Sequence, residues 1–225
     1  MDRFEAHLVE QLPDGSLQPF PPHERPERGH LIARSTAGVK PQAFISQREA
    51  AAACRNAGKR LCKLTEWYRA CIGSQKTVYP YGAKYEAKRC NVGRPHLLSM
   101  LHGSSSSRWS YADFNDPRLA TTEGFLARAG EYEGCTTSEG VHDMVGNLHE
   151  WVEDLVDRSL PKKLPVRPVI ERRIGRNTGN GIFMGGFFST TNEHGEGCTY
   201  TTAAHDPGYH DYSTGFRCCQ DPVGD

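Results

Sequence analysis

The sequence has no long hydrophobic run and no net charge. No stretch approaches the roughly 20 apolar residues that cross a bilayer, so we expect no membrane span. Lysine and arginine together number 27, and aspartate and glutamate also number 27, which gives a formal net charge of zero. A neutral chain gives no electrostatic reason to expect nucleic acid or an anionic membrane as a partner.

Internal repeats and C-x₂-C pairs are also absent, although the chain holds eight cysteines. Without such pairs a structural zinc site is disfavoured. An even number of cysteines instead favours disulfides formed in an oxidising compartment, and therefore an extracytoplasmic protein, secreted or periplasmic. No signal peptide is visible, because the chain begins with the polar segment from Met1 to Glu5. We therefore expect this chain to be part of a longer precursor with further residues on the N-terminal side of Met1.

The length of 225 residues fits one sizeable domain, and no linker divides it. Ser46 and Glu49 form a capping box before an alanine-rich run, which predicts a helix that a following glycine ends. A second short helix is predicted to start at Thr65 and to end by Gly73. The proline-rich residues 13–30 are expected to form an exposed loop, since proline removes backbone donors.

Two longer stretches show little helical or strand periodicity. Residues 84–139 are mostly irregular, and such a long stretch needs bound ions or disulfides to order it. Residues 157–180 hold seven basic residues against two acidic ones, which we interpret as a solvated excursion from the domain. Both stretches predict a loop-rich molecule with low regular secondary structure.

Three separated motifs carry the most information: GKRL at 58–61 with TEW at 65–67, DMVGNLHEW at 143–151, and GFRC at 215–218. Together and in this order they resemble the formylglycine-generating enzyme family, also called the sulfatase-modifying factor family. The resemblance covers residues 2–219. It implies an α+β fold, the C-type-lectin-like formylglycine-generating-enzyme fold, as a single domain over 1–225 whose opening N-terminal strand is truncated.

The copper ligands of the family's oxidases are missing from this chain. Those enzymes hold copper with two cysteines shortly after a Gly-Gly pair. Here Gly185 and Gly186 are followed by residues 187–195, which contain no cysteine. Cu(I) has no site without soft thiolate ligands, so no copper is expected. Related sulfoxide synthases place iron on a separate helical domain with a histidine triad, which this chain also lacks.

The resemblance implies structural calcium in the segment 143–150. The ligands would be the side chain of Asp143, the carbonyls of Gly146 and Leu148, and the side chain of Glu150. Oxygen donors suit a hard cation, and Gly146 with Asn147 permits the tight backbone turn that such a site needs. The alternative is an ordinary turn with Glu150 at the surface.

A second calcium site of the family would use Asn91 and Val92 together with Glu123 and Phe125. The family more often has aspartate at the position of Glu123, which is a departure in this chain. An ordinary loop is equally consistent with these residues.

The cysteines allow many pairings, so the sequence alone does not select one. The resemblance implies that Cys54 pairs with Cys218, and that Cys71 pairs with Cys198. Each bridge would close a loop of more than a hundred residues and contribute roughly 4–5 kcal/mol in the chain-entropy model. The other four are paired here only by expected proximity: Cys62 with Cys219, and Cys90 with Cys135.

Four histidines lie in segments that line the family's groove: His149, His194, His205 and His210. A histidine oriented by a carboxylate can act as a general base or a metal ligand. No serine, threonine or cysteine is placed by sequence to serve as its nucleophile. The alternative is a polar loop, residues 203–212, that crosses the groove and binds a ligand without chemistry.

Two function classes remain open at this point. The absent copper pair favours a non-oxidase binding or accessory module, which recognises a peptide or small-molecule ligand in the groove. The alternative is a metal-dependent, oxidoreductase-like enzyme, which uses the groove histidines or a missing partner domain. The sequence indicates no oligomeric state.

Overall fold

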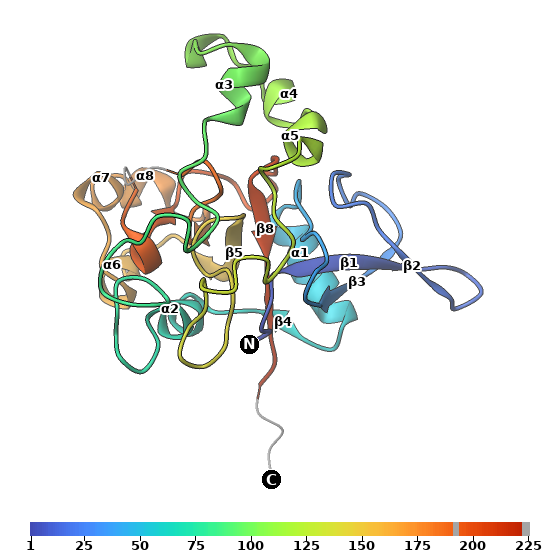
Figure 1. Ribbon diagram of the computed structural model, residues 1–225, viewed down its shortest axis with the longest axis horizontal. Helices are drawn as coiled ribbons and strands as arrows, with labels where there is room; N and C mark the ends of the chain where they lie inside the picture. The colour runs from blue at the N-terminus through green and yellow to red at the C-terminus, as the bar shows by residue number, and fades with distance from the viewer. Residues whose placement is uncertain (191–193, 222–225) are drawn as a thin grey trace.

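The computed structural model describes residues 1–190 and 194–221 and combines short helices with three small sheets (Figure 1). Residues 191–193, part of the cysteine-free segment after Gly186, lie outside the described residues. The strands are β1 (Ala6–Gln11), β2 (Leu17–Pro19), β3 (His30–Ser35), β4 (Arg60–Leu61), β5 (His149–Leu155), β6 (Gly181–Met184), β7 (Thr201–Thr202), β8 (Thr214–Phe216) and β9 (Cys218–Cys219). The helices are α1 (Gln47–Asn56), α2 (Leu64–Ile72), α3 (Leu97–His102), α4 (Tyr111–Phe114), α5 (Arg118–Thr121), α6 (Leu160–Lys163), α7 (Pro168–Glu171) and α8 (Ile174–Asn177), with 3₁₀ turns η1 (Ser106–Arg108) and η2 (Gly197–Thr199). This mixture confirms the predicted α+β class with modest regular structure.

The four-stranded sheet, in the order β7-β6-β5-β8, brings the middle and last sequence motifs together. β5 pairs antiparallel with β6 and parallel with β8, where Glu150 is in register with Gly215 and Trp151 with Phe216. The segment 143–151 and the segment 215–218 therefore lie side by side, although more than sixty residues separate them along the chain.

The N-terminal sheet, in the order β2-β1-β3, contradicts part of the expected exposed loop at 13–30. β2 pairs antiparallel with β1, with Val9 opposite Pro19, and β3 begins at His30. β2 is an edge strand, where proline is tolerated because one side of the strand needs no donor. Most of residues 13–30 are exposed and lie in loops, as predicted. The exclusion of a ladder was wrong, because proline is excluded from central strands and not from edge strands.

The first two helices form where they were predicted. The capping box of α1 is present: Glu49 N donates to Ser46 Oγ, and Ser46 N donates to the Glu49 carboxylate at 2.8 Å. Ala50, Ala53 and Cys54 are buried on one side of α1, in the same apolar cluster as Trp151. α2 begins at Leu64, one residue before the predicted start, with Lys63 as N-cap.

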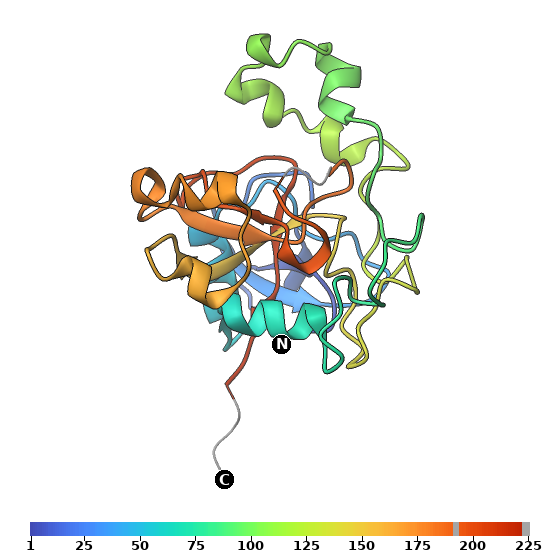
Figure 2. The same cartoon turned by 90° about the vertical axis from the view of Figure 1, so that its left-hand side faces the viewer.

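Residues 97–121 form a helical lobe that stands away from the body of the molecule (Figures 1 and 2). This lobe, α3 to α5, was expected to be irregular. Its order comes from an apolar cluster in which Leu98 and Leu119 are buried with Phe188 and Tyr212 of the body. The short helices escaped sequence analysis because each spans only four to six residues.

The basic segment 157–180 folds into α6 to α8 and is only partly solvated, which corrects the interpretation made from its charge. Leu160, Leu164, Ile170 and Ile174 are buried in the largest apolar cluster. Most of its basic side chains are exposed. A charge count records the exposed cations but not the four apolar residues that anchor the segment.

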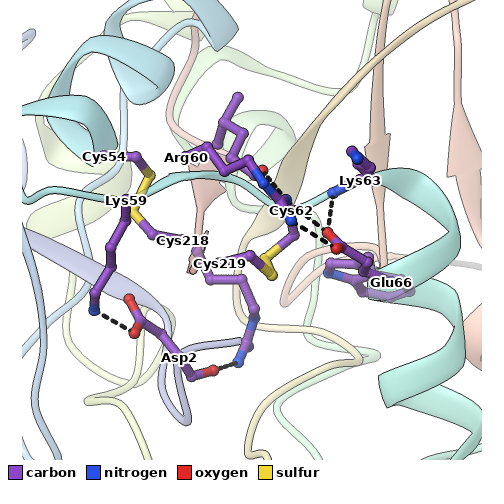
Figure 3. Close-up of a disulfide and its surroundings, with 12 residues drawn as sticks. Asp2, Cys54, Lys59, Arg60, Cys62, Lys63, Glu66, Cys218 and Cys219 are labelled. Atoms are coloured by element: carbon purple, nitrogen blue, oxygen red, sulfur yellow. Dashed lines mark hydrogen bonds and ion pairs between the residues drawn. A yellow bond between two sulfur atoms is a disulfide. The ribbon is translucent and has the colours of Figure 1, made fainter. Parts of the chain in front are cut away.

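Four disulfides link the described cysteines, and they confirm the predicted pairings. The neighbouring Cys218 and Cys219 bond different segments: Cys54 at the end of α1 and Cys62 after β4 (Figure 3). The chain start is tied to the same place, because Asp2 N donates to the Cys218 carbonyl at 2.9 Å. Within residues 1–190 and 194–221, no helix is long and apolar enough to span a membrane.

Candidate functional site

A buried ion pair joins the second and third sequence motifs. Arg217 Nε donates to Glu150 Oε2 and Nη2 donates to Oε1, each at 2.6 Å. Trp67 Nε1 adds a third bond to Glu150 Oε2 at 2.7 Å. Arg217 is 0% exposed and Glu150 is 1% exposed, so both charges are removed from water. Such a bidentate pair is a strong and directional contact.

The remaining N–H groups of Arg217 bind backbone carbonyls from the chain start and from the loop before β5. Nη1 donates to the carbonyls of Asp2 and Arg3, and Nη2 donates to the carbonyl of His142 at 2.9 Å. All five guanidinium donors are therefore satisfied. Sequence analysis singled out the GFRC motif but did not predict that its arginine is the centre of a buried network.

The segment 143–147 makes the tight turn that was predicted. Asp143, Gly146 and Asn147 all have positive φ, at 59°, 83° and 57°. A side chain at Gly146 would place its Cβ 2.2 Å from the carbonyl oxygen of Asn91, so only glycine fits. The alternative of a surface turn is wrong, because Glu150 is buried.

Glu5 is a third buried carboxylate at this place, and sequence analysis missed it. Its Oε1 accepts from Leu148 N at 3.1 Å, and its Oε2 accepts from Asn147 Nδ2. Burial raises the pKa of Glu5 well above its usual range, and the charges of Asp143 and Glu150 add to this shift. Burial also raises the pKa of Asp143 to about 6, although Gly130 N donates to its Oδ2.

In the first predicted calcium site the Asp143 carboxylate and the carbonyls of Gly146 and Leu148 are oxygen donors that suit a hard cation, whereas both oxygens of Glu150 already accept from Arg217. Glu5, Asp143 and Glu150 place three buried carboxyl groups beside one guanidinium, and the raised pKa of Glu5 favours its protonated form. No group of three or more His, Cys, Asp or Glu side chains in the described chain is arranged to hold a metal ion. A calcium ion would therefore depend on the carbonyls of Gly146 and Leu148 as well.

The residues of the second predicted calcium site do not fit. Asn91 is buried beside Phe125, and its Nδ2 donates to the Phe125 carbonyl at 2.7 Å. Its Oδ1, the atom that would bind calcium, accepts from Arg94 Nε at 3.1 Å. Val92 is half-buried and Glu123 is exposed. A guanidinium thus contacts the oxygen that the second ion would need.

A pocket of about 440 Å³ lies between the helical lobe and the four-stranded sheet. His149 and Phe183 come from β5 and β6, while the lobe contributes two residues of α4, Tyr111 and Phe114. Three of the four predicted groove histidines, His149, His194 and His205, line this pocket. The aromatic residues that line it are Tyr111, Phe114, Phe183, Phe187, Tyr209 and Tyr212.

The pocket histidines stack with aromatic rings. The Tyr200 ring lies 5.5 Å from the ring of His149 and 5.7 Å from that of His194, measured between centroids. The Phe183 ring lies 4.6 Å from His149 and 5.7 Å from His205. No three-ligand metal group that includes these histidines is found among the described residues.

His210, the fourth histidine, is buried beside the pocket and does not line it. Its ring lies 5.5 Å from the ring of Tyr111, and its backbone carbonyl accepts from the Tyr111 hydroxyl at 2.8 Å. His210 therefore holds α4 against the loop 203–212. His210 was predicted as a groove residue, and in the structure it makes a packing contact beside the pocket.

Burial keeps the deepest histidines uncharged. Burial lowers the pKa of His149 well below its usual range, and His205 and His194 add to the shift. Burial lowers the pKa of His205 as well, although the nearby Asp211 opposes it. The Nδ1 atoms of His149 and His194 are buried and have no hydrogen-bond partner in the part of the chain that the structure describes.

The fold and the three motifs define a formylglycine-generating-enzyme-like domain. The family model described as the sulfatase-modifying factor enzyme 1-like domain matches residues 20–222, so the chain belongs to this family. No characterised, curated protein matches the sequence. Among solved structures, PvdO from Pseudomonas aeruginosa is 14% identical with a TM-score of 0.47, and the match covers 79% of this chain and 60% of that one. This chain thus spans less than two thirds of that structure.

Proposed function

We propose that the protein is a non-oxidase member of its family that binds a small-molecule or peptide ligand in the pocket between the lobe and the sheet. The observation that carries this proposal is the 440 Å³ cavity with six aromatic lining residues. Binding sites are typically concave, mostly apolar, and supplied with a few polar groups that orient the ligand. The absence of the copper cysteines from the sequence supports a binding role.

The proposal is tested with two tyrosine variants of equal exposure. Tyr111 lines the pocket and is 50% exposed, whereas Tyr85 is 51% exposed and lies outside it. Saturation-transfer NMR with a set of small soluble organic compounds should detect binders of the parent protein. Tyr111→Ala should weaken their binding about 5-fold or more, and Tyr85→Ala should leave it unchanged. Equal effects of the two variants, or no binder at all, would refute the pocket.

We also propose one structural calcium ion per chain, held by the Asp143–Glu150 segment. Three buried carboxyl groups beside one guanidinium support it. At the other predicted site Arg94 contacts the side-chain oxygen of Asn91 and Glu123 is exposed, so we propose no second ion there. Equilibrium dialysis with ⁴⁵Ca²⁺ should give one ion per chain. Asp143→Ala should abolish this binding, while Glu123→Ala should not alter it. Two ions per chain, or sensitivity to Glu123→Ala, would contradict the single-site proposal.

We propose an extracytoplasmic location, secreted or periplasmic, for the folded protein. Four disulfides support this location, since such bonds persist in oxidising compartments and are rare in the cytosol. Alkylation of protein taken directly from its native source should find no free thiol. Recovery of the eight cysteines in reduced form would contradict the proposal.

The metal-dependent enzyme remains the second function, and metal analysis of the purified protein separates the two. The unpartnered Nδ1 atoms of His149 and His194 are the observation that would favour it. Calcium alone would support the binding module. Stoichiometric copper, iron or zinc that is lost on His149→Ala would support the enzyme.

A further inference from the structure

The pocket contains a buried carboxylate that no cation neutralises. Asp211 lines the pocket and is only 5% exposed. Within residues 1–190 and 194–221 it forms no ion pair. Buried charges in proteins are normally paired with an opposite charge or a metal, so an unpaired one points to a missing partner.

Hydrogen bonds hold the Asp211 carboxylate in one orientation and leave it room for another partner. Oδ1 accepts from Ser213 N at 2.8 Å and from Ser213 Oγ at 2.7 Å. Oδ2 accepts from the Tyr209 hydroxyl at 2.5 Å. Each carboxylate oxygen can accept two bonds, so Oδ2 keeps one acceptor position.

Four histidines are the only described lining residues that can become cationic. No lysine or arginine is among the described residues that line the pocket. Burial lowers the pKa of the lining histidines His96, His149 and His205 below the ordinary value, which favours their neutral forms. The pocket therefore presents net negative charge, and it disfavours an anionic ligand.

The aromatic rings that line the pocket favour organic cations over small inorganic ones. Tyr209 stacks on His205 with centroids 3.9 Å apart and lies 5.7 Å from the ring of Tyr111. Aromatic faces attract organic cations through the ring quadrupole, and they favour weakly hydrated ammonium groups. Hard inorganic cations such as Ca²⁺ and Mg²⁺ need several oxygen ligands instead, and Asp211 is the one carboxylate among the described lining residues.

We propose that this pocket binds an alkylammonium group, with Asp211 as counter-charge and the tyrosine and phenylalanine rings as its walls. The inference rests on the proposed ligand-binding function and names the chemical class of the ligand. The ammonium group belongs either to a free small molecule or to the end of a lysine side chain in a peptide.

The test compares choline with its neutral isostere 3,3-dimethylbutan-1-ol by isothermal titration calorimetry on the full chain at pH 7.5. Choline should bind about 10-fold or more tightly than the neutral compound, because only choline carries the charge. Equal binding of both would overturn the ammonium inference and leave a neutral-ligand pocket in place. Binding of neither, together with no binder in the NMR screen, would overturn the pocket itself.

Two asparagine variants in the same loop isolate the counter-charge. Asp211→Asn keeps the shape and the Oδ1 acceptor but removes the charge, and it should weaken choline about 10-fold while leaving the neutral isostere unchanged. Asp206→Asn is the matched control, because Asp206 is 68% exposed and pairs with Arg48 outside the pocket. A loss of choline binding in both variants, or in neither, contradicts the role given to Asp211.

Should Asp211→Asn unfold the protein, Tyr111→Ala replaces it. Tyr111 is half exposed, but its hydroxyl bonds the backbone of His210, so its variant is first checked for an unchanged melting temperature. Choline binding should then weaken about 5-fold. A parallel titration with N-acetyl-lysine methylamide separates the two sources. If this compound binds more tightly than choline, the natural ligand is a lysine side chain of a peptide. If choline binds more tightly, the natural ligand is a free small molecule. An unchanged choline affinity in Tyr111→Ala would refute the ring contact.

Discussion

At the scale of single residues, Arg217 joins three distant parts of the chain through one buried guanidinium. Its five donors join the chain start, the loop before β5 and the buried Glu150. A buried pair is costly to break, because the remaining charge keeps its desolvation cost without a partner.

We expect Arg217→Met to lower the free energy of unfolding by about 3–5 kcal/mol, measured by urea denaturation in EDTA. The double variant with Glu150→Gln should lose less than the sum of the two single variants. Arg48→Met, which breaks the exposed pair with Asp206, should cost less than about 1 kcal/mol. Similar losses for Arg217→Met and Arg48→Met would show that the buried pair has no special role.

The protonation of His205 should set the pH dependence of ammonium binding. The charged or titratable groups that face it are Asp211, His149, His194 and Tyr209, and its pKa is lowered from 6.5 because burial outweighs the attraction of Asp211. A protonated imidazole repels a cation, so choline affinity should be constant above pH 7. It should fall by up to about 10-fold per pH unit below the lowered pKa.

The control for this profile is His205→Phe, which keeps a ring against Tyr209 and cannot titrate. Its choline affinity should vary much less with pH than that of the parent. An affinity that rises as the pH falls would exclude a neutral His205 from the bound state.

At the scale of elements, two adjacent cysteines fasten β9 to both α1 and β4 (Figure 3). The bridges span sequence separations of 164 and 157 residues. Once one of them is closed, however, the other closes a ring of only about ten residues. The two bridges therefore reduce largely the same part of the conformational entropy of the unfolded chain.

This redundancy predicts strongly non-additive losses of stability. Replacing either the Cys54–Cys218 pair or the Cys62–Cys219 pair by serine should cost roughly 3 kcal/mol, while replacing both should cost roughly 8 kcal/mol in the chain-entropy model. Thermal and urea unfolding of the three variants measures these values. Simple additivity would show that the bridges act on separate parts of the chain.

The sequence predicted some elements and missed others for identifiable reasons. α1 was predictable because its capping box and alanine-rich run are local signals. The Asp143–Asn147 turn was predictable because glycine and asparagine favour positive φ. The helices α3 to α5 were not, since their stability comes from the contact of Leu98 and Leu119 with Phe188.

At the scale of the whole molecule, the segment that we propose to bind calcium contacts residues near both ends of the chain. Glu5 contacts Asn147, 142 residues away, and Arg217 contacts Glu150. A ligand bound there should therefore stabilise the whole native fold, and not only the loop that binds it.

We expect calcium at 100 times its dissociation constant to raise the free energy of unfolding by about 2.7 kcal/mol, and the melting temperature by about 5–10 °C. The shift should appear as one cooperative calorimetric transition, and EDTA should reverse it. Asp143→Ala should melt at the temperature of the EDTA-treated parent. A melting temperature that neither calcium nor EDTA changes would contradict the proposed calcium ion.

The sequence by itself determined the family, the cysteine pairs that the family implies, and the local turn and helix signals. Tertiary structure alone decided that Glu5 joins the carboxylate cluster, and that Asp211 lies in an aromatic pocket without an ion pair to any described residue. The physical reason is that charge balance and pocket lining depend on residues far apart in sequence. Their contacts arise only when the sheet, the lobe and the disulfides have packed together.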